Sequence, residues 1–217
     1  GDSIRVVHRG SSLPDFDLHC PLMSLPLAFK TTVATIPARI PYLAVDPVRK
    51  QQWQERLGAK VKPRIGLVWS GSGRYARRVD FRRDISFFEF RSITRFDYEY
   101  FCLQKEIRSA DQGLLKDHHQ VVTYENELND FADTAALASE MDLVISVDTA
   151  AAHVAGALGK PLWILLPEPP DFLSMTERED SPWYPTARLF RQRQMGDWAS
   201  VIARVAAELK ARFPGDA

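Results

Sequence analysis

The sequence has few cysteines, no excess of either charge and no long hydrophobic run. Its two cysteines, Cys20 and Cys102, are too far apart in the chain to suggest a disulfide framework or a metal-ligand spacing. The 28 lysines and arginines balance 28 aspartates and glutamates, which argues against a dedicated nucleic-acid-binding protein. No apolar stretch approaches the roughly 20 residues of a membrane span, and no signal peptide opens the chain. These absences predict a cytoplasmic protein with no nucleic-acid partner and no transmembrane segment.

Several familiar catalytic motifs are also missing. The sequence contains neither a Rossmann GxGxxG motif, nor a Walker P-loop, nor a GxSxG elbow. His118 and His119 are adjacent and have no partners at zinc spacing, so we expect no metal site and no cofactor. The length of 217 residues suits one α/β domain with an appendage. Because the chain begins at Gly1 rather than Met, we expect it to be a piece of a longer protein.

The first part of the chain is rich in proline. Six of the 14 prolines fall from Pro14 to Pro47, which excludes long regular helix or central strand there. A short helical or turn segment is predicted around Leu22–Phe29. The pair Asp46-Pro47, followed by Gly58 as a stop, predicts a helix. We therefore divide the chain into residues 1–46 and a domain of residues 47–217.

From Pro63 onward the pattern alternates between strands and helices. Strands that are apolar on both faces and alternate with helices predict a doubly wound, Rossmann-like parallel sheet covered on both sides, an α/β fold. The apolar stripe of residues 197–213 predicts a terminal helix. The predicted strands are Arg64–Trp69, Tyr98–Gln104, Gln120–Tyr124, Asp142–Val147, Leu162–Leu166 and Ala187–Phe190. The predicted helices between them are Ser86–Thr94, Asp111–His118, Asp133–Met141 and Thr149–Leu158.

Ligands of such sheets bind at the carboxyl ends of the strands, so the residues after each strand are candidates. After the first strand come Ser70, Gly71 and Arg74, and a cluster of five arginines runs from Arg74 to Arg83. Glycine amides and guanidinium groups at this place suit a diphosphate. The alternative is a solvated turn whose arginines pair with acidic neighbours, Asp80 and Asp84. The stretch by itself favours neither interpretation.

The fourth strand runs into Asp148, Thr149 and Ala150, with His153 shortly after. Asp148 or Thr149 is suited to cap the new helix, whose free amides and dipole favour phosphate. Asp148 is also suited to accept hydrogen bonds from sugar hydroxyls, and His153 to donate to a phosphate or sugar oxygen. The alternative is an ordinary cap with a half-buried histidine.

Two further strand ends carry polar or aromatic residues. Lys105, after the second strand, is a candidate phosphate contact, although a surface pair with Glu106 is the commoner arrangement. The loop after the fifth strand includes Trp183 and Tyr184, which would either frame a base or sugar or pin the loop to the domain. For this loop we favour the structural interpretation.

The residues from Asp148 to Pro161 resemble the motif D-T-(A/G)-x-x-H-x-A-x-A-x-G-x-P of glycosyltransferase family 9, the heptosyltransferase-like enzymes. More broadly, the chain is similar to the C-terminal part of bacterial tetratricopeptide-repeat proteins that carry such a domain. The stretches that carry this wider resemblance are Phe16–Phe29, Ile36–Asp46, Pro63–Gly71, Leu103–Lys105, Asp130–Leu137 and Asp180–Gln192.

The resemblance implies the C-terminal half of a GT-B architecture, in which two Rossmann-like lobes face each other across a cleft. Residues 1–20 would then be the last strand of the N-terminal lobe and 21–46 the interlobe connection. The N-terminal lobe and any repeat array would lie elsewhere in the protein. The donor, a nucleotide sugar with a diphosphate, would contact a set of residues that includes those after the first and fourth strands. This predicted donor-binding set is Ser70, Gly71, Arg74, Arg83, Lys105, Asp148, Thr149, Ala150 and His153.

Two hypotheses follow for function. The first is the donor-binding domain of a metal-independent inverting glycosyltransferase, inactive without the missing lobe, with an unidentified acceptor and no catalytic residue assigned. The second is a non-catalytic protein-interaction module fused to a tetratricopeptide-repeat array. It is motivated by the missing lobe and by two departures from the family pattern, at Ser72–Arg74 and at Glu106. A free-standing nucleotide-binding protein of another kind ranks last.

Overall fold

The computed structural model describes residues 5–71 and 83–214. Contacts divide the chain into two compact units, residues 1–36 and residues 37–217. This boundary lies earlier than the division between residues 46 and 47 expected from the sequence. Residues 37–46 belong to the larger unit. The Tyr42 amide donates to the Ala157 carbonyl over 3.0 Å, and Ile40 and Val45 contact the core of this unit.

The smaller unit is mostly irregular within its described residues. It contains the 3₁₀ helices η1 (Leu22–Ser24) and η2 (Val33–Thr35) and the single-turn helix α1 (Leu25–Ala28), which agrees with the predicted short helical segment. The strand that the resemblance implied within residues 1–20 is not formed by residues 5–20. A strand needs a hydrogen-bonded neighbour, and this segment has none in the described chain; Val6, for example, is 90% exposed.

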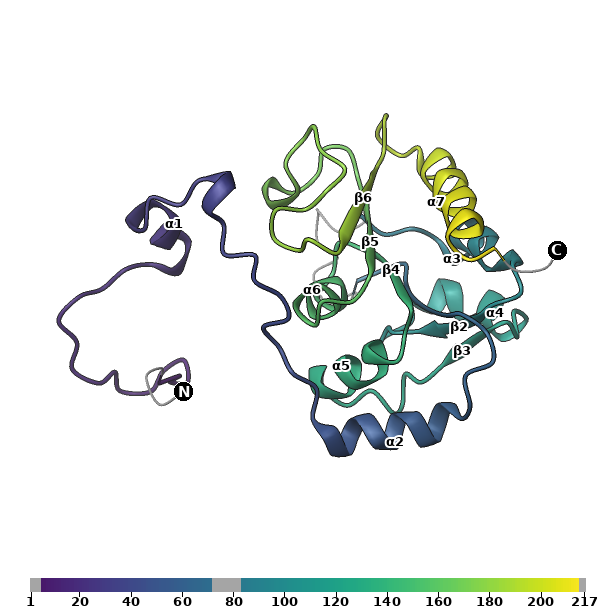
Figure 1. Cartoon of the computed structure of the whole chain (residues 1–217), viewed down its shortest axis with the longest axis horizontal. Coiled ribbons are helices and arrows are strands. Elements are labelled where there is room, and N and C mark those ends of the chain that lie inside the picture. Colours follow the sequence, from purple (N-terminus) through teal and green to yellow (C-terminus); the bar gives the residue numbers. More distant parts are fainter. Residues whose placement is uncertain (1–4, 72–82, 215–217) are drawn as a thin grey trace. The chain divides into compact units, whose positions relative to one another are not determined.

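The larger unit is built on a six-stranded parallel sheet in the order β3-β2-β1-β4-β5-β6 (Figure 1). Every predicted strand is confirmed, with ends that shift by a few residues at most. The strands are β1 (Arg64–Val68), β2 (Glu99–Cys102), β3 (Val121–Thr123), β4 (Leu143–Val147), β5 (Leu162–Leu166) and β6 (Ala187–Arg191). The doubly wound α/β fold is therefore as the alternating pattern predicts.

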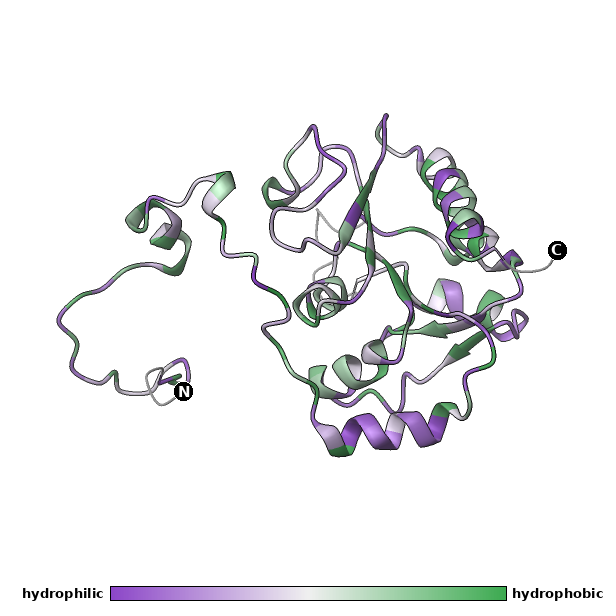
Figure 2. Cartoon of the chain, viewed as in Figure 1, coloured by the Kyte–Doolittle hydropathy of each residue, from purple (hydrophilic) through white to green (hydrophobic). Residues whose placement is uncertain are grey.

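Helices cover both faces of this sheet, and alternate strand residues feed two hydrophobic clusters. Ile65 and Leu67 of β1 join a cluster with α7, whereas Val68 joins a second cluster with α6. Figure 2 shows the strands in hydrophobic colours and α2 mostly in hydrophilic ones, as expected for an outer helix that buries only Trp53. The helices are α2 (Pro47–Leu57), α3 (Phe87–Phe90), α4 (Ser109–Lys116), α5 (Phe131–Ser139), α6 (Ala150–Ala157) and α7 (Trp198–Arg212).

One predicted helix is shorter than the sequence suggested. The segment 86–94 forms α3 and then the 3₁₀ helix η5 (Arg91–Arg95). Local side chains take up carbonyls that a continuous α-helix would use: the Ser92 hydroxyl donates to the Glu89 carbonyl, and the Thr94 hydroxyl to the Arg91 carbonyl. This local competition accompanies the change from α-helix to 3₁₀ helix.

Candidate functional site

The strand order reverses between β1 and β4, which are neighbours in the sheet but lead to β2 on one side and to β5 on the other. Open parallel sheets bind ligands at such a switch point, beyond the carboxyl ends of the strands. Here the loop after β1 begins at Trp69 and the loop after β4 begins at Asp148. The two segments that the sequence singled out therefore lie at the same point of the sheet.

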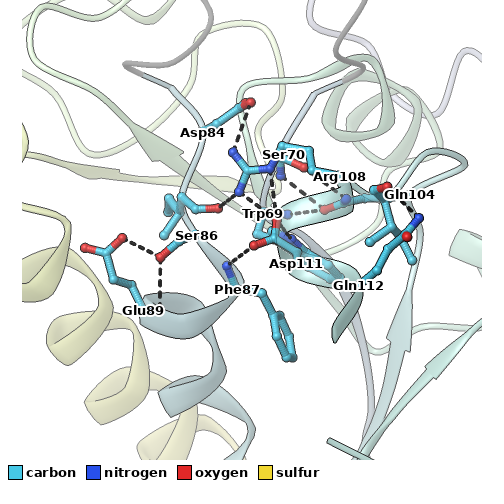
Figure 3. A network of polar contacts seen from close by, with 12 residues as sticks. Trp69, Ser70, Asp84, Ser86, Phe87, Glu89, Gln104, Arg108, Asp111 and Gln112 are labelled. Carbon is cyan, nitrogen blue, oxygen red and sulfur yellow. Dashed lines mark hydrogen bonds and ion pairs between the residues drawn. The ribbon is translucent and has the colours of Figure 1, made fainter. Parts of the chain in front are cut away.

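Gln104, at the end of β2, fixes the course of the loop after β1. Its side-chain oxygen accepts from the Trp69 amide over 2.6 Å and from the Ser70 amide over 3.1 Å, while its nitrogen donates to the Ser70 hydroxyl (Figure 3). Ser70 is buried, at 3% exposure. Its hydroxyl therefore helps to hold the loop against Gln104, a role that the sequence did not reveal.

A buried carboxylate accepts hydrogen bonds from the same loop and from α3. Asp111 accepts from the Trp69 indole over 3.1 Å and from the Phe87 amide over 3.0 Å, and it pairs with Arg108 (Figure 3). Arg108 also lies 3.5 Å from Asp84. This network holds the loop after β1 and the segment that leads into α3 in one rigid arrangement.

Arg83 connects the two loops at the switch point. It donates from Nη1 to the Asp148 carbonyl over 2.9 Å, and its Nη2 would lie only 2.3 Å from a side chain at Gly71. The guanidinium thus brings a positive charge to the crevice, and the absence of a side chain at Gly71 makes room for it. Arg83 also lies 3.7 Å from Asp84, as the turn interpretation expected. Arg74 lies outside the described residues.

The start of α6 lacks the side-chain cap that the sequence suggested. Thr149 occupies the N-cap position, but its hydroxyl lies 3.1 Å from the Ser146 hydroxyl and makes no capping bond. Among residues 5–71 and 83–214, no side chain caps the first-turn amides that begin at Ala150. Uncapped amides at a helix start, aided by the helix dipole, favour an anion.

A pocket of about 280 Å³ lies beside these loops and combines polar and aromatic walls. His153 of α6 is held on two sides, with Nε2 at 3.5 Å from the Asp148 carboxylate and Nδ1 at 3.0 Å from the Tyr184 hydroxyl. The Tyr184 hydroxyl in turn lies 3.5 Å from that of Tyr42. The pocket is lined by Pro37, Tyr42, Asp148, His153, Ile164, Leu173, Ser174, Ser181, Trp183, Tyr184 and Leu189.

The loop between β5 and β6 forms much of this pocket. The sequence favoured a structural role for it, and the contacts of Arg191 agree with that role. Arg191 at the end of β6 donates to the Met175 carbonyl over 2.8 Å and to that of Arg178 over 2.9 Å, which pins the loop. Trp183 and Tyr184 nevertheless line the pocket beside Asp148. The usable signal was their position after a strand at the ligand-binding edge.

Tyr184 is buried, at 8% exposure, and burial raises the pKa of its hydroxyl far above the ordinary value for tyrosine. The Tyr42 hydroxyl and the charge of Asp148 act in the same direction. Tyr184 therefore remains a neutral phenol that has a proton to donate.

Lys105 follows β2, and its contact differs from those of Gly71 and Arg83. Its exposed ammonium donates to the Asn129 carbonyl over 2.6 Å, in the loop that precedes α5. The structure thus groups Gly71, Arg83, Asp148 and His153 and leaves Lys105 with a different partner. The expected contact of each with a donor stays a prediction.

Within residues 5–71 and 83–214, no group of three or more histidine, cysteine or acidic side chains has an arrangement that could hold a metal ion. The same residues contain no helix with the length and apolar character needed to cross a membrane.

Comparison with known proteins links this site to one enzyme family. Residues 127–167 match the family model of glycosyltransferase family 9 (heptosyltransferase). The match contains α5, β4, α6 and β5, and therefore Asp148 and His153. It supports a glycosyltransferase-type domain.

A sequence relative and one solved structure extend the likeness, and a second solved structure matches more weakly. Protein FlbA of Caulobacter vibrioides is 29% identical over 193 residues, which is 84% of this chain but only 31% of that protein. The chain thus spans under a third of this relative's length. The E. coli ADP-heptose lps heptosyltransferase II shares the fold, with a TM-score of 0.54 and 16% identity over 83% of this chain and 56% of that one. A family 9 glycosyl transferase from Veillonella parvula has a TM-score of 0.49 and 14% identity, over 78% of this chain and 53% of that one.

Proposed function

We propose that the larger unit is the donor-binding domain of a metal-independent, inverting glycosyltransferase similar to heptosyltransferases. The observation that carries the proposal is the grouping of Gly71, Arg83, Asp148 and His153 at the switch point, beside a pocket with aromatic walls. The match of residues 127–167 to glycosyltransferase family 9 supports it independently.

The switch point has the chemistry that a diphosphate requires. Arg83 supplies positive charge, and the uncapped first turn of α6 supplies amide donors and the positive end of a helix dipole. In an inverting transfer, the acceptor oxygen bonds to the anomeric carbon as the bond from that carbon to the diphosphate oxygen breaks. Preorganised donors stabilise the charge that gathers on the departing diphosphate, and a guanidinium with helix amides performs this task without a metal ion.

The neighbouring pocket suits the sugar or the base of the donor. Ile164, Leu173 and Leu189 give it apolar walls, and Trp183 adds an aromatic surface. Such rings pack against flat or weakly polar faces, while a few fixed polar groups set the orientation. Asp148, at the pocket edge, is placed to accept hydrogen bonds from hydroxyl groups.

We propose that this unit binds the donor but does not transfer the sugar by itself. Transfer also needs an acceptor site and a base that removes the acceptor proton. In a GT-B enzyme these would come from the second lobe, and the heptosyltransferase of known structure is matched over only 56% of its chain. The acceptor remains unassigned, and a cytoplasmic location is part of the proposal.

Isothermal titration calorimetry tests donor binding directly. The whole chain is titrated with ADP, UDP, GDP and CDP and with sugars linked to each of them. We expect one nucleotide series to bind, and Asp148→Ala and His153→Ala each to weaken it by about tenfold, which corresponds to ~1.4 kcal/mol. The matched control is His119→Ala, an exposed histidine that precedes β3, which should leave affinity unchanged. If a folded sample binds none of these compounds, the proposal fails.

The second candidate is a protein-interaction module attached to a tetratricopeptide-repeat array. Its supporting observation is the smaller unit, where large apolar side chains are exposed, for example Leu18 at 91% and Leu27 at 83%. Side chains exposed in this way are available for contact with a partner. This candidate predicts no nucleotide binding, and association with its partner that survives Asp148→Ala with His153→Ala. The same titrations therefore distinguish the two candidates.

A further inference from the structure

The two ring nitrogens of His153 have partners of different character. Nε2 lies 3.5 Å from the carboxylate of Asp148, and Nδ1 lies 3.0 Å from the hydroxyl of Tyr184. An ionised carboxylate only accepts hydrogen bonds, whereas a phenol either donates or accepts. A neutral imidazole carries one proton. These partners are therefore both satisfied only when the proton is on Nε2 and Nδ1 accepts from Tyr184.

The tyrosine is well placed to be that donor. Its side chain is buried against α6, and its hydroxyl keeps its proton because burial raises the pKa of the phenol. The Tyr42 hydroxyl, at 3.5 Å, is its other polar neighbour. Hydrogen bonds thus run from Tyr42 through Tyr184 to His153, whose other ring nitrogen faces the Asp148 carboxylate at 3.5 Å.

Gly156 makes the close approach of this tyrosine possible. A side chain at position 156 would meet the Tyr184 ring at 2.6 Å, which no Cβ tolerates. Gly156 lies on α6, within one turn of His153. The missing side chain lets the aromatic ring lie against the helix, with its centroid 5.8 Å from that of the imidazole.

We propose that Tyr184 is a positioning residue that holds neutral His153 in its Nε2–H form, so that the histidine presents a donor to the pocket. The imidazole is 44% exposed, and Asp148 lies 3.5 Å from Nε2, too far for a strong hydrogen bond, so a ligand oxygen competes well for that proton. The group recognised is then a hydrogen-bond acceptor. In a nucleotide sugar this is a phosphoryl or glycosidic oxygen rather than a hydroxyl that needs a base. This last step rests on the proposed function, whereas the assignment of the proton does not.

Long-range ¹H–¹⁵N NMR spectra of the imidazole rings read the tautomer without any ligand. They are recorded on the whole chain at about pH 8.5, where ordinary imidazoles are neutral, and the signal of His153 is identified by its loss in His153→Gln. We expect the wild-type protein to show protonated Nε2 and unprotonated Nδ1. Tyr184→Phe, which removes only the hydroxyl, should convert this to a mixture of tautomers.

Two further variants separate positioning from general disturbance. Gly156→Ala keeps the hydroxyl but displaces the ring, so it should give the same mixture. Tyr100→Phe removes the hydroxyl of another buried tyrosine, on β2, which donates to the Ile93 carbonyl; it should leave the His153 tautomer unchanged. A wild-type signal from the Nδ1–H form, or an unaltered tautomer in Tyr184→Phe, overturns the proposal.

Affinity gives a second readout. With the nucleoside diphosphate that binds best, Tyr184→Phe should weaken binding by about threefold to tenfold, and Tyr100→Phe should not. If no nucleotide binds while the Nε2–H form depends on Tyr184, the proposed function fails and the positioning role stands. If nucleotides bind equally to Tyr184→Phe and its tautomer is unaltered, the positioning role fails and the proposed function stands.

Discussion

The two edges of the sheet use charged side chains in different ways. At the edge where the strands begin, Arg64 is 3% exposed, pairs with Glu99 over 2.8 Å and donates to the Gly58 carbonyl over 2.7 Å. Asp142, before β4, accepts from the Arg64 amide and from Lys60. At the edge where the strands end, polar side chains surround a pocket instead.

This difference shows how one sheet serves both stability and recognition. Arg64 is opposite Glu99 in the register of β1 and β2, so their ion pair fixes the alignment of those strands. His153 at the other edge is 44% exposed and faces a pocket of about 280 Å³. We therefore expect substitutions at the first edge to change stability and substitutions at the second to change binding.

Arg64→Met should have the largest effect of these variants, and that effect is on stability. The variant keeps the bulk of the side chain but removes the partner of Glu99 and of the Gly58 carbonyl. We expect the free energy of unfolding to fall by about 2–4 kcal/mol, because a mostly buried ion pair is broken. Urea denaturation measures the loss, and nucleotide affinity should stay unchanged.

An exposed pair provides the control for that prediction. Lys62 contacts Asp97 over 2.5 Å, but the two side chains are 43% and 81% exposed. Lys62→Met should cost less than about 1 kcal/mol, as is usual for surface ion pairs. Equal losses in the two variants would contradict the special role of Arg64.

A smaller effect, on binding rather than stability, is expected from Gly71→Ala. The new methyl group would lie 2.3 Å from Arg83 Nη2, so the guanidinium must shift from its present place beside the Asp148 carbonyl. We expect affinity for the best nucleotide to fall by about threefold to tenfold, since Arg83 is proposed to contact the diphosphate. Calorimetry measures this change.

The control here is Gly113→Ala on α4, where a side chain would meet nothing within 4 Å. It should not alter affinity and should raise stability by up to about 1 kcal/mol, because alanine is the better helix former. If Gly71→Ala binds nucleotide as the wild type does, Arg83 has no part in the site.

The smallest effect is a pH dependence of stability that comes from Asp142. Burial pushes its pKa up, but the hydrogen bonds from Lys60 and from the Arg64 amide outweigh burial, and the pKa lies below its ordinary value. A depressed pKa contributes stability above the unfolded value, about 3.9, that is lost as pH falls through the folded value.

In the wild-type protein, the free energy of unfolding should fall between about pH 5 and pH 3 as Asp142 takes up a proton. Asp142→Asn should reduce this fall by less than about 1 kcal/mol. Urea denaturation at several pH values follows the change. Lys60→Met removes one of the two donors and should flatten the curve in the same direction. An unchanged slope in both variants would show that Asp142 does not stabilise this edge.

Much of the fold was readable from local pattern. The apolar runs of β1, β4 and β5 and the stripe of α7 each lie within one continuous segment, so periodicity alone predicted them. The grouping at the switch point was partly readable, because Gly71, Asp148 and His153 lie just after strands or at a helix start. The partner of Lys105 was not readable, because the Asn129 carbonyl that accepts from it lies 24 residues further along the chain.

The sequence by itself determined the α/β class, the strand and helix segments and the edge of the sheet at which a ligand would bind. These depend on composition and periodicity over short stretches, where each residue's neighbours in space are its neighbours in the chain. Only the tertiary structure decided that Tyr42 and Tyr184, 142 residues apart, meet beside His153. That meeting depends on the space left by Gly156 and on the loop held by Arg191, and no local pattern encodes contacts between segments so far apart.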